Sequence, residues 1–264
     1  MSSLAAHLQN VSFSHSNSKI LNNICIKIPK GKIIAIMGPS GTGKSTLLKL
    51  MTGQYRPQHG KVQVLGNRVD LLAGKKLYDY RKSIGVLLQQ NALFNGLTIF
   101  ENVAYPLREI YDLPEEILSP LVKLKLECVG LRGAIDMYPG MLSGGMARRV
   151  ALARAVICDP SLMFYDEPFT GQDPITRVML MRLIKRLHDH LNMTSVIISH
   201  QVEMMNEIAD EVFILMKGHV VAAGPPSQVF KSPDPLVRQF VDGFIGNREI
   251  GFHHPSQSIN KDFL

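Results

Sequence analysis

Residues 38–45 read GPSGTGKS and match the glycine-rich pattern G-x-x-x-x-G-K-[ST], whose chemistry is phosphate binding. Glycine lets the main chain approach an anion closely, and the N–H groups of the turn and of the following helix point at it. Lys44 is expected to reach the β- and γ-phosphates of ATP, and the Ser45 hydroxyl to bind Mg²⁺. The predicted nucleotide contacts in this segment are Gly38, Pro39, Ser40, Gly41, Thr42, Gly43, Lys44, Ser45 and Thr46.

A pair of adjacent carboxylates, Asp166 and Glu167, ends the apolar run LMFYDE at 162–167. Packing alone explains this pair poorly, because Asp and Glu are rarely buried without partners. Asp166 suits the surroundings of Mg²⁺ in a nucleotide site, and Glu167 suits the general base that activates the attacking water. An apolar strand that ends in Asp-Glu is common in itself, so this prediction depends on the phosphate loop upstream.

A second glycine turn, LSGGM at 142–146, precedes the helix-forming stretch ARRVALARA. This places Ser143, Gly144 and Gly145 at a helix N-terminus, which is a second potential anion site. A subunit that holds one nucleotide has no use for two such turns, so we expect this one to serve a nucleotide bound to another copy of the chain. The simpler alternative is a capped helix.

These groups need strands and helices to position them. Apolar or alternating runs predict strands at 8–13, 24–28, 32–37, 61–66, 84–88, 162–166, 195–199 and 212–216. Helical patterns run from the phosphate loop to Gly53 and over 174–191, and a short amphipathic stretch covers 235–245. From about 96 to 158, periodic apolar residues broken by Pro106, Pro114, Pro120 and Pro139 predict a helical subdomain. The alternation of strand and helix predicts a mostly parallel α/β sheet.

Composition bounds the possibilities further. The 264 residues suffice for one large α/β domain or a domain with a subdomain. The net charge is +7, but the cationic residues are scattered and aromatic residues are few, which predicts no nucleic-acid partner. No apolar run is long enough to span a membrane, and the N-terminus does not read as a secretory signal. Cys25, Cys128 and Cys158 are expected to be buried free thiols.

The motifs together resemble the ATP-binding-cassette (ABC) family of transport ATPases over nearly the whole chain. The resemblance rests on GPSGTGKST, Gln89, LSGGM, LMFYDEP and a strand that ends in His200. It implies a P-loop NTPase fold with a RecA-like core, an N-terminal antiparallel β region and an α-helical subdomain. We expect this nucleotide-binding domain to cover 1–240, with 241–264 as a tail that contacts a partner or the second copy.

The resemblance also implies roles for individual residues. Gln89 matches a glutamine that touches Mg²⁺ and the water, with Gln90 as the neighbouring alternative. His200 matches a histidine that hydrogen-bonds the γ-phosphate. Asp173 falls in the segment between two subunits. In that family, two cassettes enclose two ATP molecules head to tail, so the turn at 143–145 would contact the γ-phosphate held by the other copy.

The adenine contact is the site that the motifs specify least. The aromatic residue that stacks on adenine in the family aligns with His15, and Phe13 is the neighbouring alternative. An imidazole can stack, although over a smaller area.

Two departures from the family pattern narrow the resemblance. Met146 stands in place of the signature glutamine, and the segment before Pro174 reads TGQD. Together with NALFNGLTIFENVAYPLRE and KLECVGLRGA, these resemble the ATPase subunits of Mla systems, which maintain outer-membrane lipid asymmetry in Gram-negative bacteria. That resemblance implies a homodimer on the cytoplasmic face of the inner membrane. It further implies a membrane permease, a small STAS-domain protein and a periplasmic lipid-binding protein of the mammalian-cell-entry type.

Three alternatives stay open at this point. The first is an ATPase for an importer of another solute. The second is a non-transport ABC protein, which usually has two cassettes or a long coiled-coil insertion. The third is a binding module that holds ATP only as a structural ligand.

Overall fold

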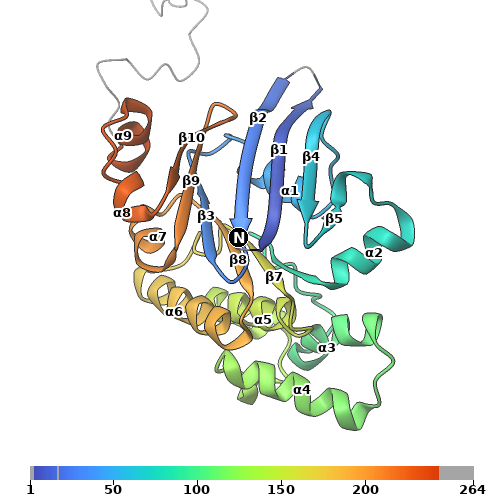
Figure 1. The fold of residues 1–264 in the computed structure, drawn as a ribbon. Coiled ribbons are helices and arrows are strands. Elements are labelled where there is room, and N and C mark those ends of the chain that lie inside the picture. The colour runs from blue at the N-terminus through green and yellow to red at the C-terminus, as the bar shows by residue number, and fades with distance from the viewer. Residues whose placement is uncertain (1–2, 17, 244–264) are drawn as a thin grey trace, which may run out of the picture.

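The computed structural model describes residues 3–16 and 18–243, and its elements form two β-sheets and a helical region (Figure 1). The smaller sheet is antiparallel, in the order β2-β1-β4-β5. Its strands are β1 (Leu4–His15), β2 (Ser18–Pro29), β4 (His59–Val64) and β5 (Asn67–Arg68). Alternate residues of β2 are buried, as expected for a strand with one face toward the core.

The larger sheet has the order β10-β9-β3-β8-β7-β6. Five of these strands are parallel to their neighbours, and only the edge strand β10 pairs antiparallel. They are β3 (Ile33–Met37), β6 (Ile84–Leu87), β7 (Leu162–Asp166), β8 (Thr194–Ser199), β9 (Glu211–Met216) and β10 (His219–Gly224). Every residue of β3 and β8 is buried, because both faces of a parallel sheet are covered.

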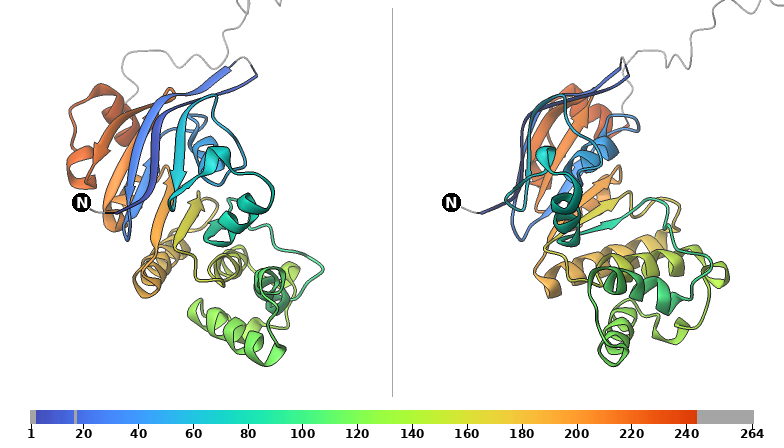
Figure 2. Two further views of the ribbon diagram at one scale, coloured as in Figure 1. Left: turned by 45° about the vertical axis from the view of Figure 1, so that its right-hand side comes forward. Right: turned by 90° about the vertical axis from the view of Figure 1, so that its right-hand side faces the viewer.

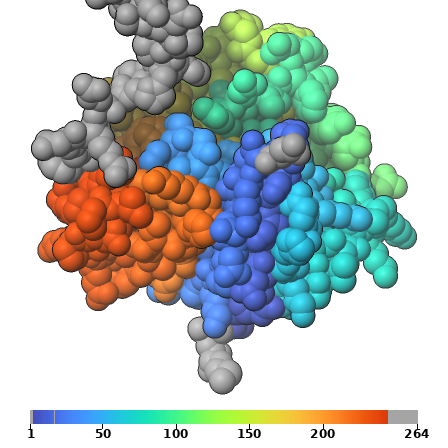
Figure 3. All heavy atoms as spheres, turned by 90° about the horizontal axis from the view of Figure 1, so that it is seen from above, coloured from blue at the N-terminus to red at the C-terminus, as the bar shows by residue number. Residues whose placement is uncertain are grey.

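Two hydrophobic cores lie on opposite faces of this sheet. Ile34 and Ile36 of β3 face the core shared with the antiparallel sheet and α1 (Lys44–Met51). Ile33, Ala35 and Met37 face the core shared with the helices on the other side. The N-terminal sheet and the C-terminal elements also meet directly, since the Asn22 N–H donates to the Gly218 carbonyl at 2.8 Å. They lie side by side, blue next to orange, in Figure 3.

The helical subdomain projects from one end of the sheets (Figure 2). It contains α3 (Ile99–Ile110), α4 (Glu115–Cys128) and α5 (Gly144–Ala155). Thr98 and Glu101 form a capping box that fixes the start of α3. Two of the prolines that we expected to break helices, Pro106 and Pro120, lie inside α3 and α4. A proline removes only one main-chain hydrogen bond, and the packed apolar faces of these helices outweigh that loss.

The remaining helices flank the sheets. They are α2 (Gly74–Lys82), α6 (Pro174–Leu191), α7 (Val202–Ile208), α8 (Pro226–Val229) and α9 (Pro235–Val241). The predicted strands and the helices at 44–51 and 174–191 are confirmed. The sequence pattern missed α2, α7, α8, β5 and β10, which carry few buried side chains. Of the predicted tail 241–264, residues 244–264 lie outside the described part of the chain.

The expectation of buried cysteines is wrong for two of the three. Cys25 and Cys128 are exposed, and Cys158 is half-buried. Cys25 lies between the buried Ile24 and Ile26, so the alternation of β2 turns it outward. Burial raises the pKa of the Cys158 thiol to about 11. Among the described residues, no helix combines the length and the apolar composition needed to cross a bilayer.

The first glycine of the phosphate loop lies against β9. At Gly38, φ is +144°, and an added Cβ would overlap the main-chain oxygen of Leu215. At Gly41, φ is +79°, but an added Cβ would meet nothing within 4 Å. We predict that Gly38→Ala lowers the free energy of unfolding by about 3 kcal/mol or more, and that Gly41→Ala lowers it by about 1 kcal/mol. Urea denaturation compares the two, and equal losses would contradict this account.

The loop before α3 is held by one buried amide. Asn102 is fully buried; its Oδ1 accepts from the Phe94 N–H at 2.8 Å, and its Nδ2 donates to the carbonyls of Phe94, Leu97 and Thr98 at 3.0–3.1 Å. Because Asn102→Ala leaves these groups without partners, we predict a loss of about 1–3 kcal/mol of stability. The exposed Asn67→Ala is the control and should change stability by less than about 0.5 kcal/mol. Thermal unfolding monitored by circular dichroism measures both.

Candidate nucleotide-binding site

The carboxyl ends of four parallel strands meet at one edge of the central sheet. β3 leads into the phosphate loop, and β6 leads into Gln89. β7 ends in Asp166 and continues into Glu167, while β8 leads into His200. Because β3, β8, β7 and β6 are consecutive neighbours and run parallel, segments far apart in the sequence are brought together here. Ligands of open α/β sheets bind at this edge.

The phosphate loop connects β3 to α1. Gly43, with φ +96°, is the N-cap of α1, so the first N–H groups of that helix face outward without a side-chain cap. Lys44 is buried, and its Nζ donates to the carbonyls of Gly38 and Pro39, each at 2.8 Å. Burial lowers the pKa of Lys44, and the negative charges of Glu167 and Asp166 oppose that shift. The loop therefore forms an anion cradle with a buried lysine at its base.

Ser45 and Asp166 present oxygen atoms side by side. The Ser45 Oγ donates to the Asp166 Oδ1 at 3.2 Å. Burial raises the pKa of Asp166 above its usual value, which means that the ionised carboxylate is under-compensated where it lies. A divalent cation beside it would favour the ionised form, and Mg²⁺ prefers oxygen ligands. The donor set of Ser45, Asp166 and the nearby Gln89 amide therefore fits Mg²⁺.

Glu167 is held in an unusual conformation with its carboxylate facing the cavity. Its φ is +47°, in the left-handed region that few residues with side chains adopt. Its Oε2 lies 2.9 Å from the Nδ1 of His200 and accepts from the Thr170 Oγ1 at 3.3 Å. Only 14% of the Glu167 side chain is exposed, against 49% for His200. The contacts with His200 and Thr170 therefore hold the Glu167 carboxylate in one orientation.

A cavity of about 400 Å³ joins these groups. Its lining residues are Ile20, Ser40, Gly41, Gly43, Lys44, Ser45, Thr46, Gln89, Glu167, Thr170 and His200. Gln89 lines this cavity and Gln90 does not, which supports Gln89 as the glutamine that contacts Mg²⁺ and water. Four other predicted site residues are not among the lining residues: Gly38, Pro39, Thr42 and Asp166. Sequence reasoning missed Ile20 and Thr170, because neither belongs to a recognisable motif.

The two candidates for the adenine contact lie elsewhere. Phe13 is buried and stacks on Tyr55, with ring centroids 5.2 Å apart and planes at 6°, so one face of its ring is already occupied. His15 is exposed at the end of β1 and is absent from the cavity lining. Ile20 on the neighbouring strand β2 does line the cavity. The His15 contact stays a prediction.

The second glycine turn forms a cavity of its own, of about 410 Å³. Ser143 is the N-cap of α5, and its Oγ accepts from the Met146 N–H at 3.2 Å. Gly144 and Gly145 line this cavity, together with Asp173. The Asp173 carboxylate accepts from the N–H groups at 175 and 176 and caps α6. None of the residues that line this cavity lines the phosphate cavity.

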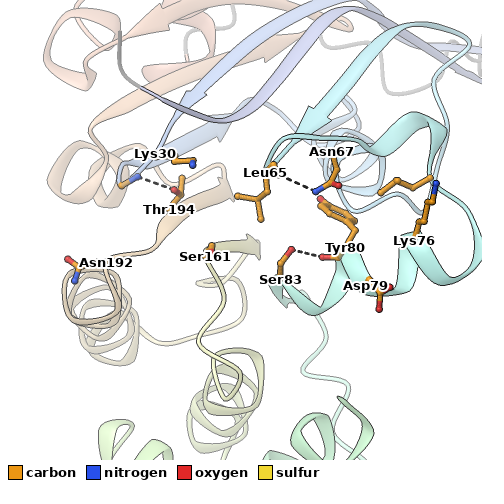
Figure 4. A pocket seen from close by; sticks show the side chains of 12 residues that line it. Lys30, Leu65, Asn67, Lys76, Asp79, Tyr80, Ser83, Ser161, Asn192 and Thr194 are labelled. Carbon is orange, nitrogen blue, oxygen red and sulfur yellow. Dashed lines mark hydrogen bonds between the residues drawn. The ribbon is translucent and has the colours of Figure 1, made fainter. Parts of the chain in front are cut away.

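A larger hollow of about 730 Å³ lies at the opposite, amino-terminal edge of the sheet (Figure 4). It is bounded by residues that precede or begin β3, β6, β7 and β8, among them Ser83, Ser161 and Thr194. Several of its polar groups already have partners within the protein: Thr194 Oγ1 accepts from the Gly31 N–H, and Ser83 Oγ donates to the Tyr80 carbonyl. It carries neither the phosphate loop nor Asp166 and Glu167, so the phosphate cavity is the candidate site of chemistry.

Comparison with known proteins agrees with this geometry. The ABC transporter family model matches residues 21–170, more than half of the chain. A solved structure of cbiO1 from Clostridium perfringens, part of the ABC transporter complex cbiONQ, superimposes with a TM-score of 0.80 at 28% identity, over 86% of this chain and 90% of that one. A dimeric ATP-binding cassette bound to ADP and Pi, in a post-hydrolysis state, gives 0.76 at 29% identity, over 84% and 98%.

Comparison of amino-acid sequences gives relatives from the same family. The chain is 46% identical over 257 residues to the intermembrane phospholipid transport system ATP-binding protein MlaF of Escherichia coli, covering 97% of this chain and 95% of that protein. The protein of the same name from Haemophilus influenzae is 45% identical, with 97% of each covered. The probable ribonucleotide transport ATP-binding protein mkl of Mycobacterium leprae is 36% identical, over 91% of this chain and 69% of that protein. The chain belongs to the ABC transporter family and is one of its ATPases.

Proposed function

We propose that this chain hydrolyses MgATP to energise phospholipid transport between the inner and outer membranes of a Gram-negative bacterium. The observation that carries the proposal is the identity of 45–46% to two intermembrane phospholipid transport ATP-binding proteins along almost their entire length. The site supports the chemistry, because a phosphate cradle, a fixed carboxylate and a histidine line a single cavity.

ATP is bound by the phosphate loop. The main-chain N–H groups from Ser40 to Thr46 surround the phosphates, and the Nζ of Lys44 exchanges its bonds to the Gly38 and Pro39 carbonyls for phosphate oxygens. Ser45, Asp166 and Gln89 would hold Mg²⁺, which neutralises the charge of the phosphates when bound. His15 is the proposed adenine contact.

Hydrolysis depends on Glu167 and His200. The Glu167 carboxylate accepts a proton from the attacking water and aligns it with the γ-phosphorus. His200 already lies 2.9 Å from that carboxylate, so it can orient Glu167 and donate a hydrogen bond to the γ-phosphate. Gln89 orients the same water and connects the site to the helical subdomain.

The second copy of the chain completes the site. We propose that Ser143, Gly144 and Gly145 contact the γ-phosphate held by the partner's Lys44, with Asp173 at the boundary between the subunits. Two observations support this arrangement: the glycine turn has a cavity separate from the phosphate cavity, and a cassette of similar fold is dimeric. ATP binds preferentially to the closed dimer, and this preference supplies the energy for closure.

The proposed assembly rests on the resemblance to Mla systems. Two copies of the chain would lie on the cytoplasmic face of the inner membrane and bind a permease. A small STAS-domain protein and a periplasmic lipid-binding protein of the mammalian-cell-entry type complete it. An importer for another solute is the second candidate, since mkl proteins are named for ribonucleotide transport. Purification with native neighbours, followed by identification of the bound lipid, distinguishes the two.

The first prediction concerns Glu167 in the assembled transporter. Glu167→Gln keeps the shape and one acceptor of the side chain but removes its basicity, so ATP binding should persist while turnover falls by about 100-fold or more. ATP-driven movement of fluorescent phospholipid between vesicles should stop with it. Phosphate release and nucleotide binding measure the two effects separately. Hydrolysis near the wild-type rate would show that Glu167 is not the base.

The second prediction concerns the origin of Ser143 in each site. In a head-to-tail dimer, a Lys44→Ala chain paired with a Ser143→Ala chain keeps one intact composite site. A Lys44→Ala/Ser143→Ala chain paired with an unmodified chain keeps none. We therefore expect higher ATP turnover from the first mixture, measured on dimers purified with two different affinity tags. If the second mixture is the more active one, Ser143 acts within its own subunit.

A further inference from the structure

Arg148 brings a positive charge into the interior directly behind the phosphate cavity. It lies in the second turn of α5, and only 2% of it is exposed. It does not line the phosphate cavity or the glycine-turn cavity. A buried charge normally requires close compensation, so its partners are informative.

The guanidinium of Arg148 contacts two loops at once. On one side, its Nη1 donates to the carbonyls of Leu88 and Gln89 and to the Asn91 Oδ1, the last two at 2.9 and 3.1 Å. On the other side, its Nη2 donates to the carbonyl of Glu167 at 2.9 Å and to that of Asp166 at 3.4 Å, and its Nε donates to the carbonyl of Pro168 at 3.0 Å.

These two loops are the ones that present Gln89 and Glu167 to the cavity. In both residues the main-chain oxygen binds Arg148, while the residue itself lines the phosphate cavity. Five of the six acceptors are main-chain carbonyls, so the charge is compensated by dipoles and not by a hydrogen-bonded carboxylate. Burial lowers the pKa of Arg148 to about 10, which leaves the group charged near neutral pH.

The conformation of Glu167 shows why such a clamp matters. With φ at +47°, its main chain is in a region that disfavours residues with side chains, and it persists only where neighbours hold it. Its N–H donates to the Ile198 carbonyl at 2.9 Å, and its carbonyl accepts from Arg148. The peptide groups on both sides of the Glu167 Cα are therefore fixed, and Arg148 supplies one of the two restraints.

We propose that Arg148 is a positioning residue for ATP hydrolysis: it binds the main chains of the Gln89 loop and the Glu167 turn together, so that both side chains meet the same γ-phosphate and water. This inference rests on the proposed ATPase mechanism and extends it. Because Arg148 belongs to the helix that Ser143 begins, it also connects the glycine turn to the catalytic loops of its own subunit.

The first test separates positioning from general stabilisation. Arg148→Gln shortens the side chain and removes the bridging donors, so the two loops lose their common anchor. We expect kcat to fall by about 100-fold, the effect of misplacing reacting groups by roughly 1 Å, and KM for ATP to change by less than about threefold. Arg148→Lys, which keeps the charge but cannot bridge both loops, should give an intermediate loss.

The matched control is Lys125→Gln. Lys125 is also a buried cation, 8% exposed, and it pairs with Asp159 away from both loops. The Lys125→Gln variant should lose about as much stability as Arg148→Gln but keep the kcat of the wild type. If Arg148→Gln fails to fold, Arg148→Lys carries the test alone. A kcat within threefold of wild type in a folded Arg148 variant overturns the proposal, as does an equal fall in Lys125→Gln.

A second measurement reports the loop directly. The chain contains no tryptophan, so Leu88→Trp introduces a single fluorescent probe at a half-exposed position beside Gln89. We expect MgATP to reduce acrylamide quenching of this probe, and Arg148→Gln to raise quenching and abolish the response. An unchanged response overturns the proposal. Lys44→Ala distinguishes failure of the proposed site from failure of the positioning role. If Lys44→Ala also hydrolyses ATP normally, the proposed nucleotide site is wrong. If Lys44→Ala is inactive while Arg148→Gln is active, only the positioning role of Arg148 is rejected.

Discussion

The parallel register of β3, β8, β7 and β6 is the constraint on which the rest of the site depends. Parallel neighbours end at the same edge, so the residues after each strand are delivered to one place however far apart they lie in the chain. Lys44 and His200 are separated by more than 150 positions, yet both line one cavity. The opposite edge of the same strands carries a larger hollow with none of these groups.

Burial of charge is the second feature that organises this edge. Lys44 and Asp166 both have pKa values shifted toward the neutral form, and for each the largest cause is desolvation. Arg148 is buried behind them under the same penalty. Lys44 and Asp166 are the under-compensated charges that prepare the site for a ligand carrying both phosphate and a cation, because binding supplies their missing partners. Desolvation of these charges therefore both lowers the stability of the free protein and favours nucleotide binding.

The separation of the two anion turns is the feature on which the proposed dimer depends. The phosphate loop and the glycine turn line different cavities, and both begin helices whose N–H groups point outward. Arg148 belongs to the helix that the glycine turn begins, and its guanidinium binds the main chains of Gln89 and Glu167. Contact at the glycine turn would therefore be transmitted through a rigid helix to Gln89 and Glu167. In the proposed dimer, this helix would connect closure directly to the chemistry.

The sequence by itself determined the phosphate loop, the carboxylate pair, the glycine turn and the α/β class, because each depends on residues close together in the chain. Local spacing is enough to identify a loop that needs glycine or a strand that ends in acid. Only the tertiary structure shows that Gln89 lines the cavity, that Phe13 stacks on Tyr55, and that Cys25 and Cys128 face solvent. It also adds Ile20 and Thr170 to the lining. Arg148 gives the clearest reason for that division. Nothing in ARRVALARA distinguishes it from its neighbour Arg149, and its role exists only because three segments of the chain meet around one guanidinium.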